Sequence, residues 1–389
     1  MNLEYFFQDI KSSPFLEGYA DKFDSYQELP FLDKKKLREL LRNNFHLEKE
    51  QKGVHLLRTG GTMDESLIVP IDPAENHLQR QMLVDRLVEE KLITSTDVCI
   101  NLFAYKHLYR SAALLDHIIE YSGATSVGLA GTTIDEYVMN FARILKANTI
   151  VGSPSRIFQL ANYLKEHNQT FPFKKFIFGG EVLPDYFLDV IRNQFHTEQV
   201  LGLFGAIEIG TFAYCNFTAN PNKYRILDSM VHIEIDQPNA EGYGNMVITN
   251  LVKRRFPIIK YRIGDIARLI PEDDANYFEM KSRGAYGFRL KQTYIFEDQI
   301  KPLLRNFDRY QIRLSYNDRK KTCIEVLVSK AGLMNGELDN LERMLREVIG
   351  IAASEYQLEV KKAISKDYYQ NPISLKSPRL VDNRIKAVI

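Results

Sequence analysis

Apolar residues recur along this chain in two alternating patterns, one typical of helices and one typical of buried strands. Residues 76–92 place Leu78, Met82, Leu87 and Leu92 at helical spacing with charged residues between them, which predicts an amphipathic helix. Further along, we expect strands at 148–153, 175–180 and 200–205 and helices at 155–167 and 184–196. Short apolar strands that alternate with helices are typical of an α/β domain.

The pattern changes near residue 228, where successive strands follow one another without long helices. We expect these strands at 230–236, 245–250, 257–263 and 265–270, with turns such as PNAEGYGN and RIGD between them. Strong turn formers between short apolar runs predict a β-rich subdomain.

A third pattern begins after Arg283. Strands at 311–316 and 323–329, a helix at 336–349 and a strand at 357–363 predict a small α+β domain. The segment SRGAYG contains Gly284 and Gly287, which suit a flexible joint. We therefore predict a large N-terminal domain at 1–282 and a small, mobile C-terminal domain at 283–389.

Composition and charge exclude several classes of protein. The chain has 389 residues, of which 45% are hydrophobic and 26% charged, as expected for compact domains rather than for disordered chains or coiled coils. Lys plus Arg total 51 against 50 Asp plus Glu, so no broad charge attracts nucleic acid or a membrane surface. We interpret the short basic clusters 34–36, 253–255 and 319–321 as solvated faces.

Cysteine content indicates a reducing compartment. Cys99, Cys215 and Cys323 are far apart and odd in number, which excludes a disulfide framework or a zinc knuckle. We expect Cys215 to be a small buried apolar residue. The sequence shows neither a signal peptide nor a transmembrane stretch, so we predict a cytoplasmic protein.

Four segments carry candidate chemistry, and each alone fits a plain turn as well as a site. Thr59 and Thr62 flank a glycine pair that can present N–H groups to a phosphate, although no Gly-Lys-Ser/Thr follows. FGGEVLP (178–184) ends a strand where α/β sheets place ligands. LFGAIEIG (203–210) presents Glu208, a candidate Mg²⁺ ligand, and YRIGDIARL (261–269) presents Asp265, a candidate acceptor for ribose hydroxyls.

The order of these segments resembles the adenylate-forming superfamily of acyl-CoA synthetases, carrier-protein adenylation domains and luciferases, and most closely its phenylacetate-CoA ligase-like branch. The resemblance covers nearly the whole chain. Further matching segments are 12–45, SPSRIFQLANYL at 153–164, GNMVITNLVKRRFPIIKYRIGDIARL at 244–269 and ISLKSPRLVDNR at 373–384.

The resemblance implies a role for individual residues. Glu208 would hold Mg²⁺, and Lys376 would bridge the substrate carboxylate and the α-phosphate. The implied nucleotide-binding residues are Thr59, Gly60, Gly61 and Thr62 over the β- and γ-phosphates, Gly179, Gly180 and Glu181 at the adenine, Phe204 and Gly205 along adenine and substrate, and Asp265 and Arg283 at the ribose.

The implied reaction uses ATP, Mg²⁺ and coenzyme A. Mg²⁺ and the Lys376 ammonium would offset the negative charge that accumulates when a carboxylate attacks ATP, giving an acyl adenylate and pyrophosphate. In ligases of this family the small domain then rotates and a thiol attacks the activated carbonyl, releasing AMP. The implied partners are a small aryl or acyl carboxylic acid and either coenzyme A or an acyl carrier protein; a role in aromatic natural-product biosynthesis follows only by analogy.

Departures from the family pattern keep a second function open. Met63, Asp64 and Glu65 follow Thr62 where the family has Gly and Lys, and Ile207 replaces the usual Thr before Glu208. Gln292 and Thr293 stand near the expected thiol tunnel. The alternative hypothesis is an ATP-independent acyl transferase between carrier-protein and coenzyme A thiols, and a third is a binding or scaffolding protein.

The acid-binding side of the site is expected in NLFAYKHLYRSAALL (101–115), with Tyr105 and His107 as substrate-binding residues. Aromatic residues there would suit an aryl acid. The alternative is that these aromatic residues belong to the core of a buried strand and a helix start, with His107 as a packing residue.

Overall fold

The chain divides into two compact units, Met1–Gly284 and Ala285–Ile389. The computed structural model describes residues 2–50, 52–59, 67–105, 108–181, 183, 185–272, 275–283, 287–290, 293–317, 321–350, 356–370 and 380–382. The division falls close to the boundary that we expected near residue 282. Each unit is described by itself below.

The first unit contains the α/β pattern expected from the sequence. Its helices are α1 Leu3–Ile10, α2 Lys34–Asn44, α3 Pro73–Glu89, α4 Ser111–Tyr121, α5 Asp135–Ile144, α6 Pro154–Glu166 and α7 Asp185–Phe195, with short 3₁₀ turns at Pro14–Leu16 and Leu47–Lys49. Its strands are β1 His55–Arg58, β2 Ile68–Ile71, β3 Val98–Asn101, β4 Thr125–Gly128, β5 Thr149–Gly152, β6 Lys175–Gly179, β7 Gln199–Ala206, β8 Gly210–Asn216, β9 Lys223–Ile226, β10 Val231–Asp236, β11 Gly244–Asn250, β12 Tyr261–Pro271 and β13 Asn276–Arg283.

Local sequence signals fix where these helices begin. The helix that we predicted at 76–92 starts earlier, at Pro73, because the Asp72 carboxylate accepts hydrogen bonds from the N–H groups of Ala74 and Glu75. Asp at the N-cap followed by Pro at the first helical position is a strong start signal.

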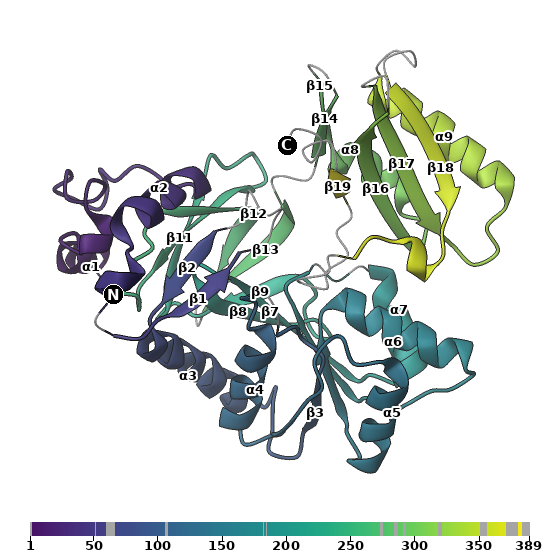
Figure 1. Cartoon of the computed structure of the whole chain (residues 1–389), viewed down its shortest axis with the longest axis horizontal. Coiled ribbons are helices and arrows are strands. Elements are labelled where there is room, and N and C mark those ends of the chain that lie inside the picture. Colours follow the sequence, from purple (N-terminus) through teal and green to yellow (C-terminus); the bar gives the residue numbers. More distant parts are fainter. Residues whose placement is uncertain are drawn as a thin grey trace. The chain divides into compact units, whose positions relative to one another are not determined.

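Within the described residues, eleven strands of this unit form one sheet in the order β10-β11-β12-β13-β9-β8-β7-β6-β5-β3-β4. Strands from β4 to β7 pair in parallel, and from β7 onward the pairs are antiparallel. Figure 1 shows α3 and α4 on one side of the parallel strands and α5, α6 and α7 on the other. Apolar side chains of the sheet and its helices form one large core.

Two expectations about the antiparallel strands need correction. The strands expected as a separate β-rich subdomain continue the same sheet as the α/β strands. The segments 257–263 and 265–270, expected as two strands, give one strand, β12, which starts only at Tyr261. The interruption that we interpreted as a turn is Gly264, whose positive φ of 85° lets the strand change direction locally without ending.

The N-terminal segment contacts a strand of the large sheet that comes much later in the sequence. Leu32 donates its N–H to Lys260 O at 2.8 Å, and the N–H of Arg262 donates to Leu32 O at 2.8 Å. This bridge places Leu32 beside Tyr261 at the start of β12, and Lys260 Nζ also donates to Gln27 O and Leu29 O at 3.2 Å.

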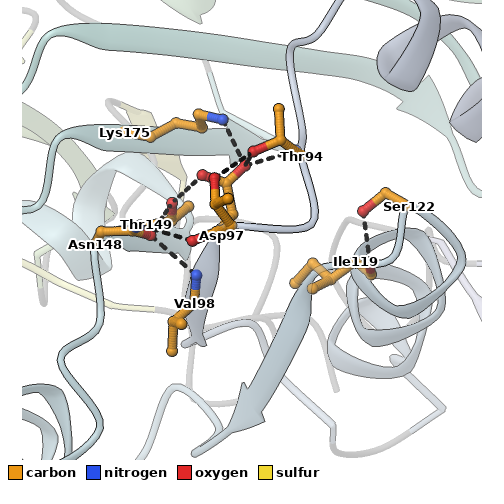
Figure 2. Close-up of polar contacts among 9 residues, drawn as sticks. Thr94, Asp97, Val98, Ile119, Ser122, Asn148, Thr149 and Lys175 are labelled. Atoms are coloured by element: carbon orange, nitrogen blue, oxygen red, sulfur yellow. Dashed lines mark hydrogen bonds and ion pairs between the residues drawn. The ribbon is translucent and has the colours of Figure 1, made fainter.

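A buried ion pair joins the amino-terminal ends of the parallel strands (Figure 2). Lys175 at the start of β6 lies 2.6 Å from Asp97, which immediately precedes β3. Thr149 of β5, the strand between them, donates to the same carboxylate at 3.4 Å, and the N–H of Thr94 donates at 2.8 Å. The pair therefore ties three neighbouring strands together at the end of the sheet opposite Gly179 and Phe204.

The second unit has the α+β pattern predicted from the sequence. Its described elements are β14 Gly287–Leu290, β15 Thr293–Phe296, α8 Glu297–Leu304, β16 Arg309–Tyr316, β17 Thr322–Ser329, α9 Asn335–Ile349, β18 Tyr356–Lys362, a 3₁₀ turn at Ser365–Asp367 and β19 Leu380–Asp382. A sheet in the order β18-β17-β16-β19 packs against α9 around its own apolar core, which includes Leu314, Leu341 and Leu345.

Candidate functional site

The carboxyl-terminal ends of β6 and β7 bring two of the predicted motifs side by side. Gly179 is the last residue of β6 and pairs in parallel with Leu203 of β7, one residue before Phe204. Gly180 follows with a positive φ of 76°, a conformation that favours glycine and turns the chain out of the sheet. Glu181 is half-buried at this turn. The edge where ligands bind in open α/β sheets thus carries both glycine motifs.

Phe204 and Gly205 have structural roles at the end of β7. The Phe204 ring packs edge-on against Phe212, Tyr224 and Phe278, with ring centroids 5.0 to 5.5 Å apart. At Gly205 a Cβ atom would lie 2.3 Å from Gly210 O, so only glycine allows β7 and β8 to approach this closely. The predicted contacts of both residues with nucleotide remain predictions.

Glu208 lies in the tight turn between β7 and β8, and hydrogen bonds fix both its side chain and its backbone. The residue is 7% exposed. The Tyr261 hydroxyl donates to its Oε1 at 2.9 Å, and Lys253 Nζ donates to its backbone oxygen at 2.5 Å. A fixed, buried carboxylate just after the carboxyl-terminal end of a strand is suited to holding a hard divalent cation.

Lys253 corrects the interpretation of the basic cluster 253–255 as a solvated face. Its side chain is buried, and burial lowers its pKa to about 8, although the carboxylates of Glu75 and Glu208 raise it. Arg255 is also paired, with Asp72 at 2.9 Å. Runs of basic residues are usually solvated, and the sequence gives no sign that the first of these three residues points inward.

Side chains that the sequence did not single out fix the rest of this turn. Ile209 O accepts hydrogen bonds from Asn250 Nδ2 at 2.8 Å and from Gln79 Nε2 at 3.2 Å. Asn250 Oδ1 in turn accepts from the N–H of Lys253 at 3.0 Å. The only sequence signal for this arrangement was that Asn250 ends an apolar strand. Gln79, which donates to the same oxygen, is 130 residues from Ile209 in sequence.

Thr59 closes the base of the predicted phosphate loop. Its N–H donates to Leu67 O at 2.9 Å, and its Oγ1 accepts from the N–H of Leu67 at 2.8 Å. These bonds continue the β1–β2 ladder by one pair and bring the two ends of segment 60–66 together.

Tyr109 contacts the base of the predicted phosphate loop and lies within electrostatic range of Glu208. Its hydroxyl donates to Thr59 O at 3.2 Å. Burial raises the pKa of Tyr109, the Arg58 guanidinium lowers it, and the Glu208 carboxylate raises it. The last influence places Glu208 within electrostatic range of the tyrosine that touches the loop base. Tyr109 belongs to the aromatic segment that we expected on the acid-binding side, but the sequence favoured Tyr105 and His107 instead.

Asp265 lies on the strand that carries Tyr261, the partner of Glu208. It is 4% exposed, and it stands opposite Arg283 in the β12–β13 ladder. The structure therefore places two predicted ribose-binding residues at paired positions, although the side chain of Arg283 lies outside the described part of the chain.

The remaining predicted residues divide into two groups. Tyr105 is described and is 62% exposed, which excludes the core-aromatic alternative for this residue. Gly60, Gly61, Thr62, His107 and Lys376 lie outside the described residues.

Three further observations concern metals, cysteines and membranes. Across the described ranges, no group of three or more His, Cys, Asp and Glu side chains could hold a metal ion. Cys215 is buried, as expected, and burial raises its pKa to about 12. None of the helices in the described part of the chain is both long and apolar enough to span a bilayer.

Comparison with known proteins adds one relative by sequence. The chain is 24% identical to an indoleacetate–lysine synthetase from Pseudomonas savastanoi over 259 residues, which is 65% of this chain and 64% of that protein. The match therefore spans less than two thirds of that relative's length. No family model matches the chain.

Comparison with solved structures gives matches over almost the whole chain. A 2-hydroxyisobutyryl-CoA ligase in the postadenylation state has a TM-score of 0.72 at 14% identity, with 98% of this chain and 89% of that chain covered. MatB from Rhodopseudomonas palustris with bound ATP has a TM-score of 0.57 at 13% identity, over 89% and 71%. An anthranilate CoA ligase in complex with anthranoyl-AMP has a TM-score of 0.55 at 12% identity, over 90% and 72%.

These structures differ in substrate and share one architecture with this chain. The finer assignment to the phenylacetate-CoA ligase-like branch stays a prediction. The chain has the fold of the adenylate-forming superfamily, which the order of its sequence motifs predicted.

Proposed function

We propose that this protein is an ATP-dependent ligase that activates a small-molecule carboxylic acid as an acyl adenylate. The observation that carries the proposal is the hydrogen bond from the Tyr109 hydroxyl to Thr59 O, which joins the base of the predicted phosphate loop to the segment expected on the acid-binding side. Solved structures with this fold hold ATP or an acyl-AMP, which supports the same use of the site here.

The donor set at Glu208 fits Mg²⁺. A carboxylate oxygen is the ligand type that this cation prefers, and the Tyr261 hydroxyl orients that carboxylate. Because the described residues supply no three-residue metal cluster, most of the cation's ligands would come from triphosphate oxygens and water, as is usual for Mg²⁺ at nucleotide sites. When bound, Mg²⁺ would offset the charge of the triphosphate.

The chain's own residues would hold and orient the two anionic substrates. Thr59 fixes the base of the loop proposed to cover the phosphates, and Asp265 would accept hydrogen bonds from the ribose hydroxyls. Lys376 would bring a positive charge to the attacking carboxylate, and its removal should affect the transition state more than substrate binding.

A second question is which acceptor takes the acyl group. The solved structures with this fold include CoA ligases, which supports coenzyme A or a carrier-protein thiol. The relative by sequence is named for joining indoleacetate to lysine, and this supports an amine acceptor instead. Either acceptor would attack the same activated carbonyl, so the first half-reaction is common to both.

The test of the first half-reaction is pyrophosphate release from ATP and Mg²⁺ with a panel of aryl, indolic and aliphatic acids. We expect release that depends on one class of acid and falls at least about a hundredfold in Lys376→Ala, as for removal of other transition-state charges. Lys366→Ala, an exposed lysine of the same unit, is the matched control and should keep full activity.

The same assay distinguishes the alternative function. If no acid gives pyrophosphate, the ATP-independent acyl transferase becomes the better hypothesis, and exchange of an acyl group between coenzyme A and carrier-protein thiols is then the assay. If pyrophosphate is released, adding coenzyme A or free amino acids and identifying the product by mass spectrometry determines the acceptor.

A further inference from the structure

The Arg80 guanidinium contacts His117, and Arg110 and His55 lie within electrostatic range of both residues. The proposed ligase chemistry uses none of these four residues. Arg80 is on α3, His117 is on α4, Arg110 immediately precedes α4, and His55 is the first residue of β1. We name these four residues the arginine–histidine cluster. Helices α3 and α4 lie side by side in Figure 1 and contact each other.

Both guanidinium groups have polar atoms without partners. Arg80 is only 8% exposed. The Nε atoms of Arg80 and Arg110 are buried, and neither has a hydrogen-bond partner among the described residues. Over the same residues, no ion pair joins either guanidinium to a carboxylate. Buried charged donors almost always have a partner, so this pair of arginines is unusual.

The positive charges in the cluster repel one another. Burial and the charge of Arg110 lower the pKa of Arg80. Burial lowers the pKa of His55, as do Arg110 and Arg80, and burial followed by Arg80 lowers that of His117. Like charges that lie close together without an anion destabilise the folded state. Such a loss of stability is typical of binding sites, where the bound ligand supplies the missing charge.

Three carboxylates influence the histidines of the cluster, and two of them, Asp72 and Asp116, are already engaged elsewhere. Asp72 accepts from Arg255 and from the first turn of α3. Asp116 Oδ1 accepts from Asn101 at 2.9 Å and from Ser126 at 2.5 Å, and Glu120 is exposed. Asp72 raises the pKa of His55 less than burial and the two arginines lower it. Glu120 raises the pKa of His117 more than Arg110 lowers it, but burial and Arg80 are the larger influences and the net pKa is lowered.

Neighbouring side chains hold the cluster in shape. The Arg80 guanidinium contacts His117 Nδ1, and because arginine has only donors, this nitrogen must accept and the imidazole is neutral. Tyr121 stacks on His117 with ring centroids 5.6 Å apart, and its hydroxyl lies 3.2 Å from His77 Nδ1. His117 is therefore a positioning residue for Arg80.

We propose that the arginine–histidine cluster is a binding site for a small oxyanion, a phosphate or carboxylate group that Arg80 and Arg110 contact directly. Guanidinium groups match the geometry of both anions. Arg110 follows Tyr109, whose hydroxyl contacts Thr59, so an anionic group of a substrate is the natural occupant. The proposal does not depend on adenylate formation, since it concerns binding alone.

The test measures the histidine pKa values of the full chain by NMR, with the His55 and His117 signals assigned from His→Gln variants. The probes are inorganic phosphate and acetate, each compared with chloride at equal ionic strength. A bound anion favours the charged imidazole, so the pKa of both histidines should rise, on the order of one unit. Chloride should have little effect.

Variants decide whether the arginines are responsible. Arg110→Gln should raise the dissociation constant for the anion, read from the histidine shifts, about tenfold or more, because it removes a charge-assisted contact. Arg86→Gln on the same α3 helix, where the side chain is exposed and paired with Glu89, is the matched control and should respond like wild type. Arg80→Lys provides a second variant that keeps the charge but loses the fork, and it should respond more weakly than wild type.

Each outcome bears on the proposal. A response to phosphate alone identifies a phosphate site, of the kind that coenzyme A would occupy, and a response to both anions identifies a carboxylate-tolerant site that an amino acid could occupy. Unchanged histidine pKa values with both anions would overturn the proposal, as would an equal response in Arg110→Gln. Failure of the ligase assay would leave these results unaffected.

Discussion

At the scale of single residues, the candidate site depends on side chains that carry no chemistry of their own. Glu208 could be singled out because its motif could be matched. The side chains that fix its turn, Tyr261, Lys253 and Asn250, could not. Each comes from the strand-rich segment 244–269, where alternation of apolar and polar residues says which positions are buried but not which distant turn they touch. Burial of a lysine is rare, so the inward position of Lys253 could not be predicted from its charged neighbours.

Tyr261→Phe tests whether the orientation of Glu208 matters. The substitution removes one hydrogen bond to the carboxylate and keeps the ring, so we expect pyrophosphate release to fall about tenfold, consistent with a hydrogen bond to a charged group. Tyr19→Phe is the matched control, because that buried hydroxyl donates to Pro30 O at 2.7 Å rather than to Glu208. Both variants should lose some stability, and only the first should lose activity; equal activities would contradict the orienting role.

Because its pKa is lowered in the folded protein, Lys253 should make the free energy of unfolding increase with pH in the alkaline range. Its folded pKa of about 8 lies below the usual 10.5, so between these values the unfolded chain binds more protons than the folded one. Stability from this residue therefore rises with pH from about 8 to 10.5, by up to about 1.4 kcal/mol per pH unit, and is constant below pH 8.

Urea unfolding of wild type and Lys253→Met at several pH values measures this contribution. The difference in unfolding free energy between the two proteins should move in favour of wild type from pH 8 to pH 10. A difference that stays constant over this range would show that the folded lysine keeps its ordinary pKa.

At the scale of elements, periodicity predicted part of the helices and of the buried parallel strands; β3, β4 and α5 were not predicted. It located α6, α7, β5, β6 and β7 to within a few residues, because short parallel strands and amphipathic helices have distinct patterns. It failed at β12, where Gly264 and Asp265 imitate a turn. A glycine inside a strand and a glycine that ends one look alike in sequence, and only the pairing with β11 and β13 distinguishes them.

The ion pair between Asp97 and Lys175 should contribute strongly to the stability of the parallel strands. Lys175→Met leaves the Asp97 carboxylate buried without its cation, which typically costs about 3–5 kcal/mol. Lys174→Met is a matched control, since its neighbouring pair with Glu198 is exposed and should contribute no more than about 1 kcal/mol. Chemical denaturation of both variants gives the comparison, and similar losses would argue against a special role for the buried pair.

At the scale of the whole molecule, each unit has its own apolar core. Ile177 belongs to the core of the first unit and Leu345 to that of the second, and both are at most 1% exposed. Units with separate cores can unfold independently. The sequence predicted this organisation from the change of pattern after Arg283, because a strand-strand-helix-strand segment needs a core of its own.

Thermal unfolding should therefore show two transitions in calorimetry. Leu345→Ala should lower one transition and Ile177→Ala the other, each by a cavity cost of about 2–5 kcal/mol. The variants thereby assign the transitions to the units. A single transition that both substitutions shift equally would mean that the two units unfold cooperatively.

The bridge from Leu32 to Lys260 and Arg262 also has a consequence during protein synthesis. Residues 2–50 leave the ribosome before their partner strand β12, which is made more than two hundred residues later. At typical rates of translation this interval is roughly 10 to 50 s, during which residues 2–50 have apolar side chains such as Phe6, Phe7 and Leu32 without their final contacts. The segment is thus a natural client for chaperones that act on nascent chains.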